Sequence, residues 1–401
     1  MIRYIIVIPF LFFISCEAQK EPELSKLRYK DSLGVKYVDV WGDSENEPPR
    51  KVYGPKIPVE LQVSEYIRRI FEDSRGDLWF GTNGEGLYRY SQGKLLRYGD
   101  IVGFVGSAVR AIAEDKKGNL WIATSSGLCK IEKESLDHPC FNNTCIHRHE
   151  VEKEFREHAS TISKLFYFYG RNEGLVNIDL WCLLVDRNDE IWIGSAGGAY
   201  RMTGNEFKAF EIPAADLKKY PNAFPEPKLI NHILQDRLGN IWFASNGNGI
   251  YRYDWQSLEN ISEKDGLSNN VVQSILEDKN GSLWFSTRFG GLSRFSEGQF
   301  TTFRFHLPVP SGLSTNFIWL GLEDHKCDSP WGIWFATVGG GIYYFNGEEF
   351  IHYGKKQGLD NLFIQSLCRD SKGNLWVGSS GGLYRLEGKN FINITKQGPW
   401  K

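Results

Sequence analysis

The sequence has little of what marks several large classes of protein. Its 401 residues carry 47 basic and 49 acidic side chains, a formal charge of −2, so no bulk positive field attracts nucleic acid or anionic lipid. No apolar run approaches the roughly 18 residues that a membrane-spanning helix requires. Methionine is scarce at 2 residues, whereas 13 Trp, 18 Tyr, 26 Phe and 42 Gly favour short strands joined by tight turns. We therefore expect an all-β protein without a nucleic-acid partner.

Common enzyme motifs are also missing. The Gly-rich segments Asn83–Tyr88 and Val338–Tyr343 lead into further strand-like residues, so no helix N-terminus is available for a phosphate. Nothing resembles a nucleophile elbow, a Walker loop or a Rossmann turn. The sequence predicts no bound cofactor for the repeated part of the chain.

The first residues are typical of an export signal. Met1–Arg3 supplies a positive start, and the apolar run Tyr4–Ser15 is too short to span a bilayer as a stable helix. The run ends at Cys16, and polar residues follow at once. We expect residues 17–35 to form a tether and the rest of the chain to be exported.

The end of this segment resembles a bacterial lipoprotein signal, in which the cysteine becomes the lipidated first residue of the mature protein. Phe13 and Ile14 depart from the pattern, which usually has Leu and a small residue there. The resemblance implies that residues 1–16 are the signal, that Cys16 is lipidated, and that this anchor is the chain's membrane attachment. The location would then be the periplasm or outer membrane of a Gram-negative-type cell envelope, and ordinary secretion is the alternative.

The rest of the chain repeats one unit seven times. Each copy contains an Asp-x-x-Gly-type turn followed by one tryptophan: Trp79, Trp121, Trp192, Trp242, Trp284, Trp334 and Trp376. Successive tryptophans are 42, 71, 50, 42, 50 and 42 residues apart, so the period is 42 residues and the excess is insertion. A period of 40 to 50 residues with four strand-like segments predicts a seven-bladed β-propeller of four-stranded antiparallel blades, over residues 61–401.

Hydrogen bonding and backbone conformation in the turns explain the residues that recur from copy to copy. The aspartates can each accept hydrogen bonds from amides of their own turn, and glycines such as Gly76 and Gly281 permit a positive φ. The seven aspartates are Asp73, Asp115, Asp186, Asp236, Asp278, Asp324 and Asp370. Because each lies on a separate blade, we predict structural turns rather than a ring of metal ligands, and tryptophans that pack between blades.

Two stretches, from Gly266 to Thr287 and from Gly358 to Ser379, carry the string G-L-[SD]-N-x-[VF]-x-x-[IL]-x-x-D-x-x-G-x-L-W-x-[GS]-[TS]. This string resembles the propeller repeat in the periplasmic sensor halves of bacterial hybrid two-component regulators. The resemblance extends over all seven copies and implies a sensor propeller for extracellular ligands, often glycans. It also implies a separate signalling or transport partner, since no kinase accompanies the repeats here.

Propeller topology indicates where a ligand would bind. The innermost strands line the central channel, and the loops that lead into them share one face, the mouth, with the loops after the second strands. Five residues before each turn aspartate lies a variable column: Arg68, Arg110, Trp181, Asn231, Gln273, Trp319 and Gln365. The column six residues before the aspartate is uniformly aliphatic, as packing between blades requires.

This variable column is our predicted ligand site. Guanidiniums and amides donate to hydroxyls or carboxylates, and indoles stack on sugar rings, so we expect a small extracellular ligand such as a glycan. Arg288 joins the predicted site, with Phe289, Asn246, Asn248 and Glu85 as further candidates. The alternative is that a channel rim is polar only because it is hydrated.

Two insertions interrupt the period. Residues 132–164, in the second copy, include helix-like sequence and four of the eight histidines, and three outcomes stay open for them. Cys140 and Cys145 can form a disulfide, as an exported protein favours, or can bind zinc with His147 and His149, or neither. Residues 211–228 connect copies three and four on the mouth side, where a lid could form.

An enzyme is the alternative class. Streptogramin lyases have a seven-bladed propeller with comparable repeats, and that family relies on histidine at the mouth with a divalent cation. The inner-strand columns here contain one histidine, His232, without a second in a matching position. A glycan-active hydrolase such as a sialidase would need three mouth arginines, whereas the variable column holds two. His232 beside a carboxylate would favour the enzyme, and His232 packed between blades would favour binding.

The sequence leaves two ways to place the N-terminal strand-like segment. Copy seven contains its own fourth strand, so the strand-like segment Lys36–Trp41 is either an extra edge strand or a seal between the first and last blades. Within residues 36–60, the proline-rich part after this strand is predicted to be a connector.

Cys129, Cys182 and Cys368 occupy strand positions and are predicted to be buried core residues.

Overall fold

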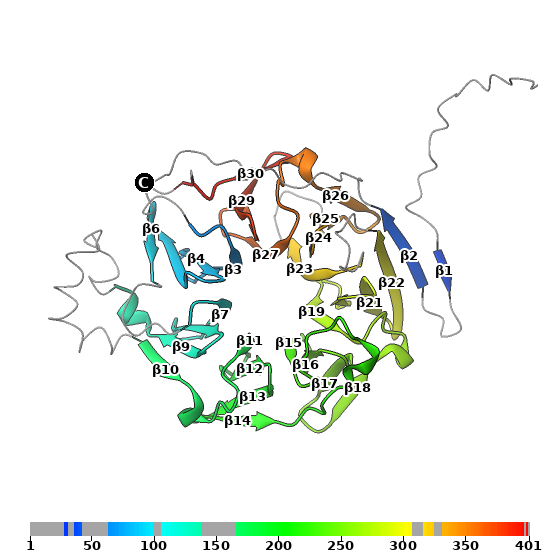
Figure 1. The fold of residues 1–401 in the computed structure, drawn as a ribbon, viewed down its shortest axis with the longest axis horizontal. Coiled ribbons are helices and arrows are strands. Elements are labelled where there is room, and N and C mark those ends of the chain that lie inside the picture. Colours follow the sequence, from blue (N-terminus) through cyan, green and yellow to red (C-terminus); the bar gives the residue numbers. More distant parts are fainter. Residues whose placement is uncertain are drawn as a thin grey trace, which may run out of the picture.

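The computed structural model describes residues 28–30, 36–41, 63–98, 106–137, 166–306, 316–324, 331–396 and 398–399. Seven blades, each of four antiparallel strands, form a ring (Figure 1). In each sheet the first strand lies nearest the axis and the fourth lies on the rim, so the predicted seven-bladed propeller is confirmed. The described residues contain short 3-10 helices but no α-helix, and no helix among them is long and apolar enough to cross a membrane.

Blades 1 to 4 follow the chain from the inner strand outward. Blade 1 contains β3 (Ile67–Glu72), β4 (Leu78–Thr82), β5 (Leu87–Ser91) and β6 (Lys94–Arg97). Blade 2 contains β7 (Val109–Glu114), β8 (Leu120–Thr124), β9 (Gly127–Ile131) and β10 (Phe166–Tyr169). Blade 3 contains β11 (Leu180–Val185), β12 (Ile191–Ser195), β13 (Gly198–Thr203) and β14 (Glu206–Phe210). Blade 4 contains β15 (Ile230–Gln235), β16 (Ile241–Ser245), β17 (Ile250–Tyr253) and β18 (Leu258–Ile261).

Blades 5 to 7 complete the ring. Blade 5 contains β19 (Val272–Glu277), β20 (Leu283–Thr287), β21 (Leu292–Ser296) and β22 (Gln299–His306). Blade 6 contains β23 (Ile318–Asp324), β24 (Gly332–Thr337), β25 (Ile342–Phe345) and β26 (Phe350–Tyr353). Blade 7 contains β27 (Ile364–Arg369), β28 (Leu375–Ser379), β29 (Gly382–Glu387) and β30 (Asn390–Asn393). The 3-10 helices are η2 (Lys133–Asp137), η3 (Arg171–Glu173), η4 (Leu217–Lys219), η5 (Glu263–Asp265) and η6 (Lys355–Gln357).

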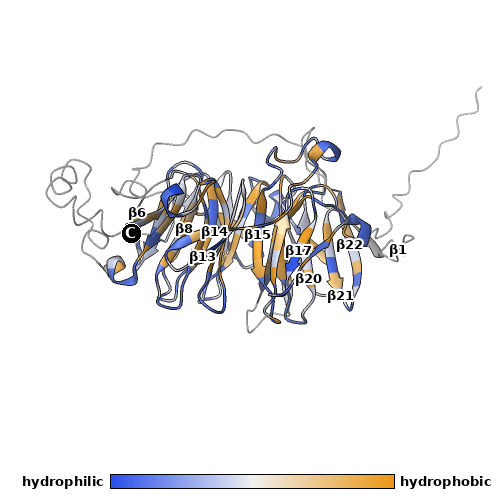
Figure 2. Ribbon diagram, turned by 90° about the horizontal axis from the view of Figure 1, so that it is seen from below, coloured by the Kyte–Doolittle hydropathy of each residue, from blue (hydrophilic) through white to orange (hydrophobic). Residues whose placement is uncertain are grey.

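One apolar core lies between each pair of neighbouring blades, and each contains one repeat tryptophan. Trp79 of blade 1, for example, packs with Ile112 and Ile122 of blade 2. Seen from the side, the apolar residues gather along the strands of the disc (Figure 2). The predicted packing of the tryptophans between blades is therefore confirmed.

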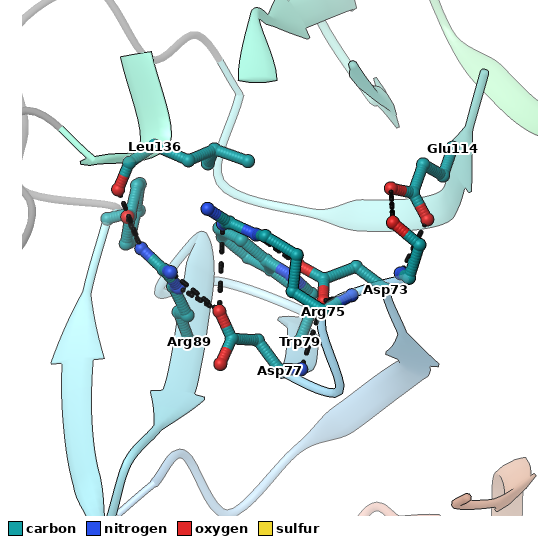
Figure 3. A network of polar contacts seen from close by, with 9 residues as sticks. Asp73, Arg75, Asp77, Trp79, Arg89, Glu114 and Leu136 are labelled. Carbon is teal, nitrogen blue, oxygen red and sulfur yellow. Dashed lines mark hydrogen bonds and ion pairs between the residues drawn. The ribbon is translucent and has the colours of Figure 1, made fainter. Parts of the chain in front are cut away.

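Each turn aspartate holds its tryptophan in place. Asp73 Oδ1 accepts the amides of Arg75 and Asp77 at 3.0 and 2.9 Å, and its Oδ2 accepts Trp79 Nε1–H at 2.9 Å (Figure 3). The aspartate–indole bond recurs in all seven blades. Gly76 has φ 81°, which spares the turn the strain that a side chain would add. Because these carboxylates accept hydrogen bonds from the amides and the indole of their own blade, the structural interpretation of the turns is confirmed.

Neighbouring turns are also linked in a way that the repeat pattern did not indicate. The amide of Ser74 donates to Glu114 Oε2 of the next blade at 2.7 Å, and Lys279 donates likewise to Glu323 at 2.6 Å. Among the described residues, six turn amides donate to a side chain of the next blade: the acceptor is a glutamate of the inner strand in four cases, Gln235 in one and the turn residue Asp189 in one. At the end of β27, Arg369 replaces the acid and binds Asp324 of blade 6 instead.

The ring closes by packing of complete blades. β27 and β3 lie side by side at the axis, and the Val63 amide donates to the Thr395 carbonyl at 3.1 Å. The N-terminal strand β2 (Lys36–Trp41) instead pairs in parallel with β22 on the rim of blade 5, and β1 (Arg28–Lys30) pairs with β2. Figure 1 shows this hairpin outside the ring. The segment is therefore an extra edge strand, and the alternative that it seals blades 1 and 7 was wrong.

Candidate functional site

The predicted ligand-binding column coincides with a β-bulge in every inner strand. The register between β3 and β4 shifts between Ile67 and Arg69, which leaves Arg68 as the extra residue, and the same shift recurs in the other six blades. A bulge re-aims the side chain of its unpaired residue. The seven side chains of the column are therefore released from the regular alternation of the strand.

The flanking residues show what the bulge does to packing. Ile67 and Ile70 lie three residues apart yet both pack against blade 7, although a regular strand would place them on opposite faces. The aliphatic column that begins at Ile67 is at most 1% exposed in all seven blades, which confirms its predicted role in packing. The extra residue thus lies between two packing positions without serving either.

Trp181 is the centre of the most connected part of the mouth. The Arg110 guanidinium carbon lies 4.3 Å from the centroid of the indole, and that of Arg68, from blade 1, lies 5.7 Å from it. Asp179 holds both partners, because its Oδ1 lies 2.7 Å from Arg110 Nη1 and its Oδ2 accepts the Trp181 Nε1–H at 3.1 Å. Arg68 also donates to Asn83 Oδ1 at 2.7 Å.

The insertion at residues 211–228 extends this group across blade 4. The Phe224 ring lies 4.8 Å from the Trp181 ring and 4.4 Å from the Arg288 guanidinium carbon. Asn246 Nδ2 donates to the carbonyls of Phe224 and Glu226 at 2.8 and 3.1 Å, which fixes the segment beside the mouth. The insertion is therefore on the mouth side, and it contributes a ring to the site.

Arg288, which follows β20, is enclosed by aromatic rings. Its guanidinium carbon lies 4.4, 5.0 and 5.7 Å from the rings of Phe224, Phe317 and Phe289. Phe317 also contacts the half-buried Trp319 at 5.8 Å between ring centroids. We call Arg68, Arg110, Trp181, Phe224, Arg288 and Trp319 the mouth cluster.

Burial lowers the pKa of all three arginines of the cluster. It lowers the pKa of Arg68 to about 10, and the positive charge of Arg110 acts in the same direction. It lowers the pKa of Arg110 too, against the opposing effects of Asp179 and Glu226. For Arg288, burial alone lowers the pKa, and no described carboxylate counteracts it. Among the described residues, two carboxylates thus act on the three poorly hydrated cations of the cluster.

Three residues of the predicted column lie outside the mouth cluster. Gln273 and Gln365 are buried at 5% and 8% exposure. Asn231 donates from Nδ2 to the Val272 carbonyl of blade 5 at 2.7 Å. These amides border the channel, but they present little surface to a ligand.

The further candidates from the loops after the second strands mostly have structural partners. Glu85 accepts from the Tyr88 hydroxyl at 2.6 Å, and Asn248 donates to the Pro213 carbonyl at 3.0 Å. Asn246 anchors the insertion, as described above. Of this group, Phe289 remains beside Arg288 in the mouth.

Several buried polar atoms around the mouth lack a hydrogen-bond partner among the described residues. They are Arg110 Nε, Asn231 Oδ1, Asn246 Oδ1, Gln273 Nε2 and Arg288 Nη1. A buried polar atom without a partner is costly, and native proteins normally supply one. Water or a bound ligand can supply it here.

His232 directly follows the bulge residue of β15 and is half-buried. Its Nδ1 accepts the amide of Ile275 in blade 5 at 3.3 Å, so the neutral ring carries its proton on Nε2. Burial lowers the pKa of this imidazole to about 4, and Arg69 adds to the effect. The histidine thus links two blades, with Arg69 rather than a carboxylate as the charge acting on it. This is the arrangement that favours binding over catalysis.

The opposite face of the propeller carries a surface depression of about 360 Å³ on blade 3, lined by Asp189, Glu190, Arg201 and Met202 among others. Its arginine is paired, because Arg201 Nη2 lies 2.6 Å from Glu190 Oε2. Glu190 and Arg201 therefore satisfy each other, and Asp189 accepts the amide of Lys116 in blade 2 at 2.8 Å.

The cysteine predictions have mixed outcomes. Cys129 and Cys182 are buried as predicted, whereas Cys368 is half-buried. The disulfide and zinc candidates Cys140, Cys145, His147 and His149, and the lipidation candidate Cys16, lie outside the described residues. They stay predictions.

Sequence comparison identifies the repeats. The family model of the two-component regulator propeller matches residues 62–84, 103–126, 266–289 and 358–381, which are parts of blades 1, 2, 5 and 7. The chain is thus a propeller that carries two-component regulator propeller repeats. No curated protein matches the sequence at a significant level.

Solved structures share the fold at low identity. The extracellular domain of the putative hybrid two-component system BT3049 from B. thetaiotaomicron is 19% identical with a TM-score of 0.57, over 82% of this chain and 41% of that one. This chain therefore spans less than half of that domain. A catalytically inactive virginiamycin B lyase from Staphylococcus aureus with quinupristin is 13% identical (TM-score 0.57; 81% and 97% covered). A streptogramin B lyase is 15% identical (TM-score 0.58; 82% and 96% covered). At these identities the likeness is one of fold.

Proposed function

We propose that this protein is an exported, lipid-anchored binding module of the sensor type, which takes a small extracellular ligand, such as a glycan, at the channel mouth. The mouth cluster carries the proposal. It combines half-buried indoles and guanidiniums on one face, in positions that blade packing does not require. Aromatic faces with a few convergent polar groups are typical of ligand sites.

The repeat class supports a signalling role. The repeats are those of two-component regulators, and BT3049 is described as a hybrid two-component system. We infer that binding in the periplasm or at the outer membrane is passed to a separate signalling or uptake protein.

A propeller enzyme, either a lyase or a glycan hydrolase, is the competing function, because two solved propellers of the same fold are lyases. The described part of the channel does not favour it. His232 is half-buried, its Nδ1 accepts a backbone amide, and its pKa is lowered to about 4, so near neutral pH it holds no extra proton to give as a general acid.

The proposal is tested with the full-length chain in detergent micelles and a panel of sugars, sulfated sugars and peptides, read out as melting temperature. Trp319→Ala and Arg110→Ala should abolish a ligand-induced shift. Arg201→Ala, on the opposite face of blade 3, is the matched control and should preserve it. If no ligand of the panel changes the melting temperature, or if the mouth variants bind unchanged, the proposed site is wrong.

A further inference from the structure

The mouth cluster has an excess of positive charge that is unevenly compensated. Two carboxylates act on it, Asp179 and Glu226, and both act on Arg110. Asp179 also acts on Arg68, whose guanidinium contacts Trp181 and Asn83. No described carboxylate acts on Arg288, at the other side of the mouth.

Arg288 is the least satisfied of these cations. Its Nη1 is buried without a hydrogen-bond partner, and no ion pair of this residue exists among the described residues. Three phenyl rings, of Phe224, Phe289 and Phe317, surround it at 4.4 to 5.7 Å. Ring faces attract the positive charge, but they do not replace acceptors for the N–H groups in the plane of the guanidinium.

An anion would satisfy this group in a way that a neutral hydroxyl would not. A guanidinium surrounded by apolar rings is poorly hydrated, so an ion pair formed there gains more than one formed on an open surface. Its planar fork matches the two oxygens of a carboxylate or sulfate. The site therefore selects for negative charge at Arg288.

The rest of the cluster indicates what carries that charge. Trp319 is half-buried, contacts only the Phe317 ring among described aromatic residues, and has no hydrogen-bond partner for its Nε1–H there. Its ring can stack on the apolar face of a sugar while its N–H donates to a hydroxyl. Trp181 supplies a second indole across the mouth, beside Arg68 and Arg110.

We propose that the ligand of the mouth is an acidic saccharide, whose carboxylate or sulfate group pairs with Arg288 while its ring stacks on Trp319. This inference rests on the proposed function and narrows it to a class of ligand. Arg68 lies on the far side of the mouth and provides a second cation for a ligand with more than one acidic sugar.

Matched ligands separate charge from shape. Calorimetry on the full-length chain in detergent compares trigalacturonate with its methyl ester, and a sulfated disaccharide with its desulfated form. We expect each acidic form to bind at least about tenfold more tightly than its neutral partner, and the affinity to fall as salt is raised. The carboxylate and sulfate arms tell the two sources of charge apart.

Variants at Arg288 locate the effect. Arg288→Gln should weaken the acidic ligand by about tenfold or more and leave a neutral ligand almost unchanged. Arg288→Lys keeps the charge but loses the fork, so its affinity should be intermediate. Arg201→Ala on the opposite face is the control. Should Arg288→Gln fail to fold, Arg68→Gln and the salt dependence of the unmodified protein test the same preference.

The outcomes also separate the two proposals. Equal affinity for acidic and neutral forms, with no effect of Arg288→Gln, would overturn the acidic ligand but keep a saccharide-binding mouth. Binding of neither acidic nor neutral saccharides would overturn both. A preference for the acidic form that survives loss of Arg288 and Arg68 would show that the charge is recognised elsewhere.

Discussion

His232 should make the stability of the propeller depend on pH in a window where the carboxylates contribute little. Burial holds the pKa of this imidazole at about 4, compared with 6.5 for an exposed histidine. Between these values the unfolded chain binds a proton that the folded chain does not. The free energy of unfolding therefore falls as the pH falls from 7 towards 4.

The size of this effect follows from the two pKa values. For a group that titrates near 6.5 when unfolded and near 4 when folded, linkage predicts a loss of about 2 kcal/mol between pH 7 and pH 5. The turn carboxylate Asp115 has a pKa that its indole and amide partners lower in spite of burial. Such groups lose their contribution below pH 4, outside this window.

Urea unfolding followed by tryptophan fluorescence at pH 7 and pH 5 measures the loss. His232→Asn is the variant of choice, since the asparagine Oδ1 can accept the Ile275 amide in place of Nδ1 without titrating. The unmodified protein should lose about 2 kcal/mol more than the variant over this interval. If both proteins lose the same amount, His232 is not held neutral in the folded state, and our description of the channel interior is wrong.

Two further predictions concern the scaffold. Asp278→Ala removes the fully buried acceptor of two turn amides and of the Trp284 indole, and should lower the free energy of unfolding by about 3 kcal/mol or more in urea. Asp254→Ala removes the same kind of turn acceptor at an exposed site and should destabilise the protein much less; equal losses would contradict the role given to the indole bond. Deletion of residues 1–41 removes β1 and β2, so the blades should keep their circular dichroism while the uncovered edge of β22 promotes self-association in sedimentation. A variant that stays monomeric would contradict this.

The ring itself was predictable because its determinants recur with the period. The aspartate, the tryptophan on the strand that follows its turn and the aliphatic residue of the inner strand appear in every copy, and each performs the same task in every blade. The Gly-Leu pair of the repeat string also has a role that depends only on its immediate surroundings. Gly358 caps η6 with φ 90°, where a Cβ atom would lie 2.1 Å from the Phe391 carbonyl oxygen, and Leu359 is fully buried. Local rules suffice for such positions.

The site was predictable only in part, because some of its members come from outside the period. Arg68, Arg110, Trp181 and Trp319 were found by counting within the repeat. Phe224 belongs to an insertion without counterpart in the other blades, so no column in the alignment of the repeats contains it. The docking of β2 on blade 5 was equally hidden, since all seven outer strands offer an edge and the sequence does not rank them.

The bulge explains why this site can vary while the fold does not. In six inner strands, one extra residue lets the apolar residue before it and the second residue after it pack against the same neighbouring blade, as Ile364 and Leu367 of β27 do in the core shared with blade 6. The extra residue is thereby freed from the core, and the seven blades can carry arginine, tryptophan or amide there without repacking. Trp319→Ala should consequently change the melting temperature much less than Trp334→Ala, whose indole is buried between blades 6 and 7. A large loss of stability from Trp319→Ala, comparable to that of Trp334→Ala, would mean that the bulge column belongs to the scaffold rather than to a binding site.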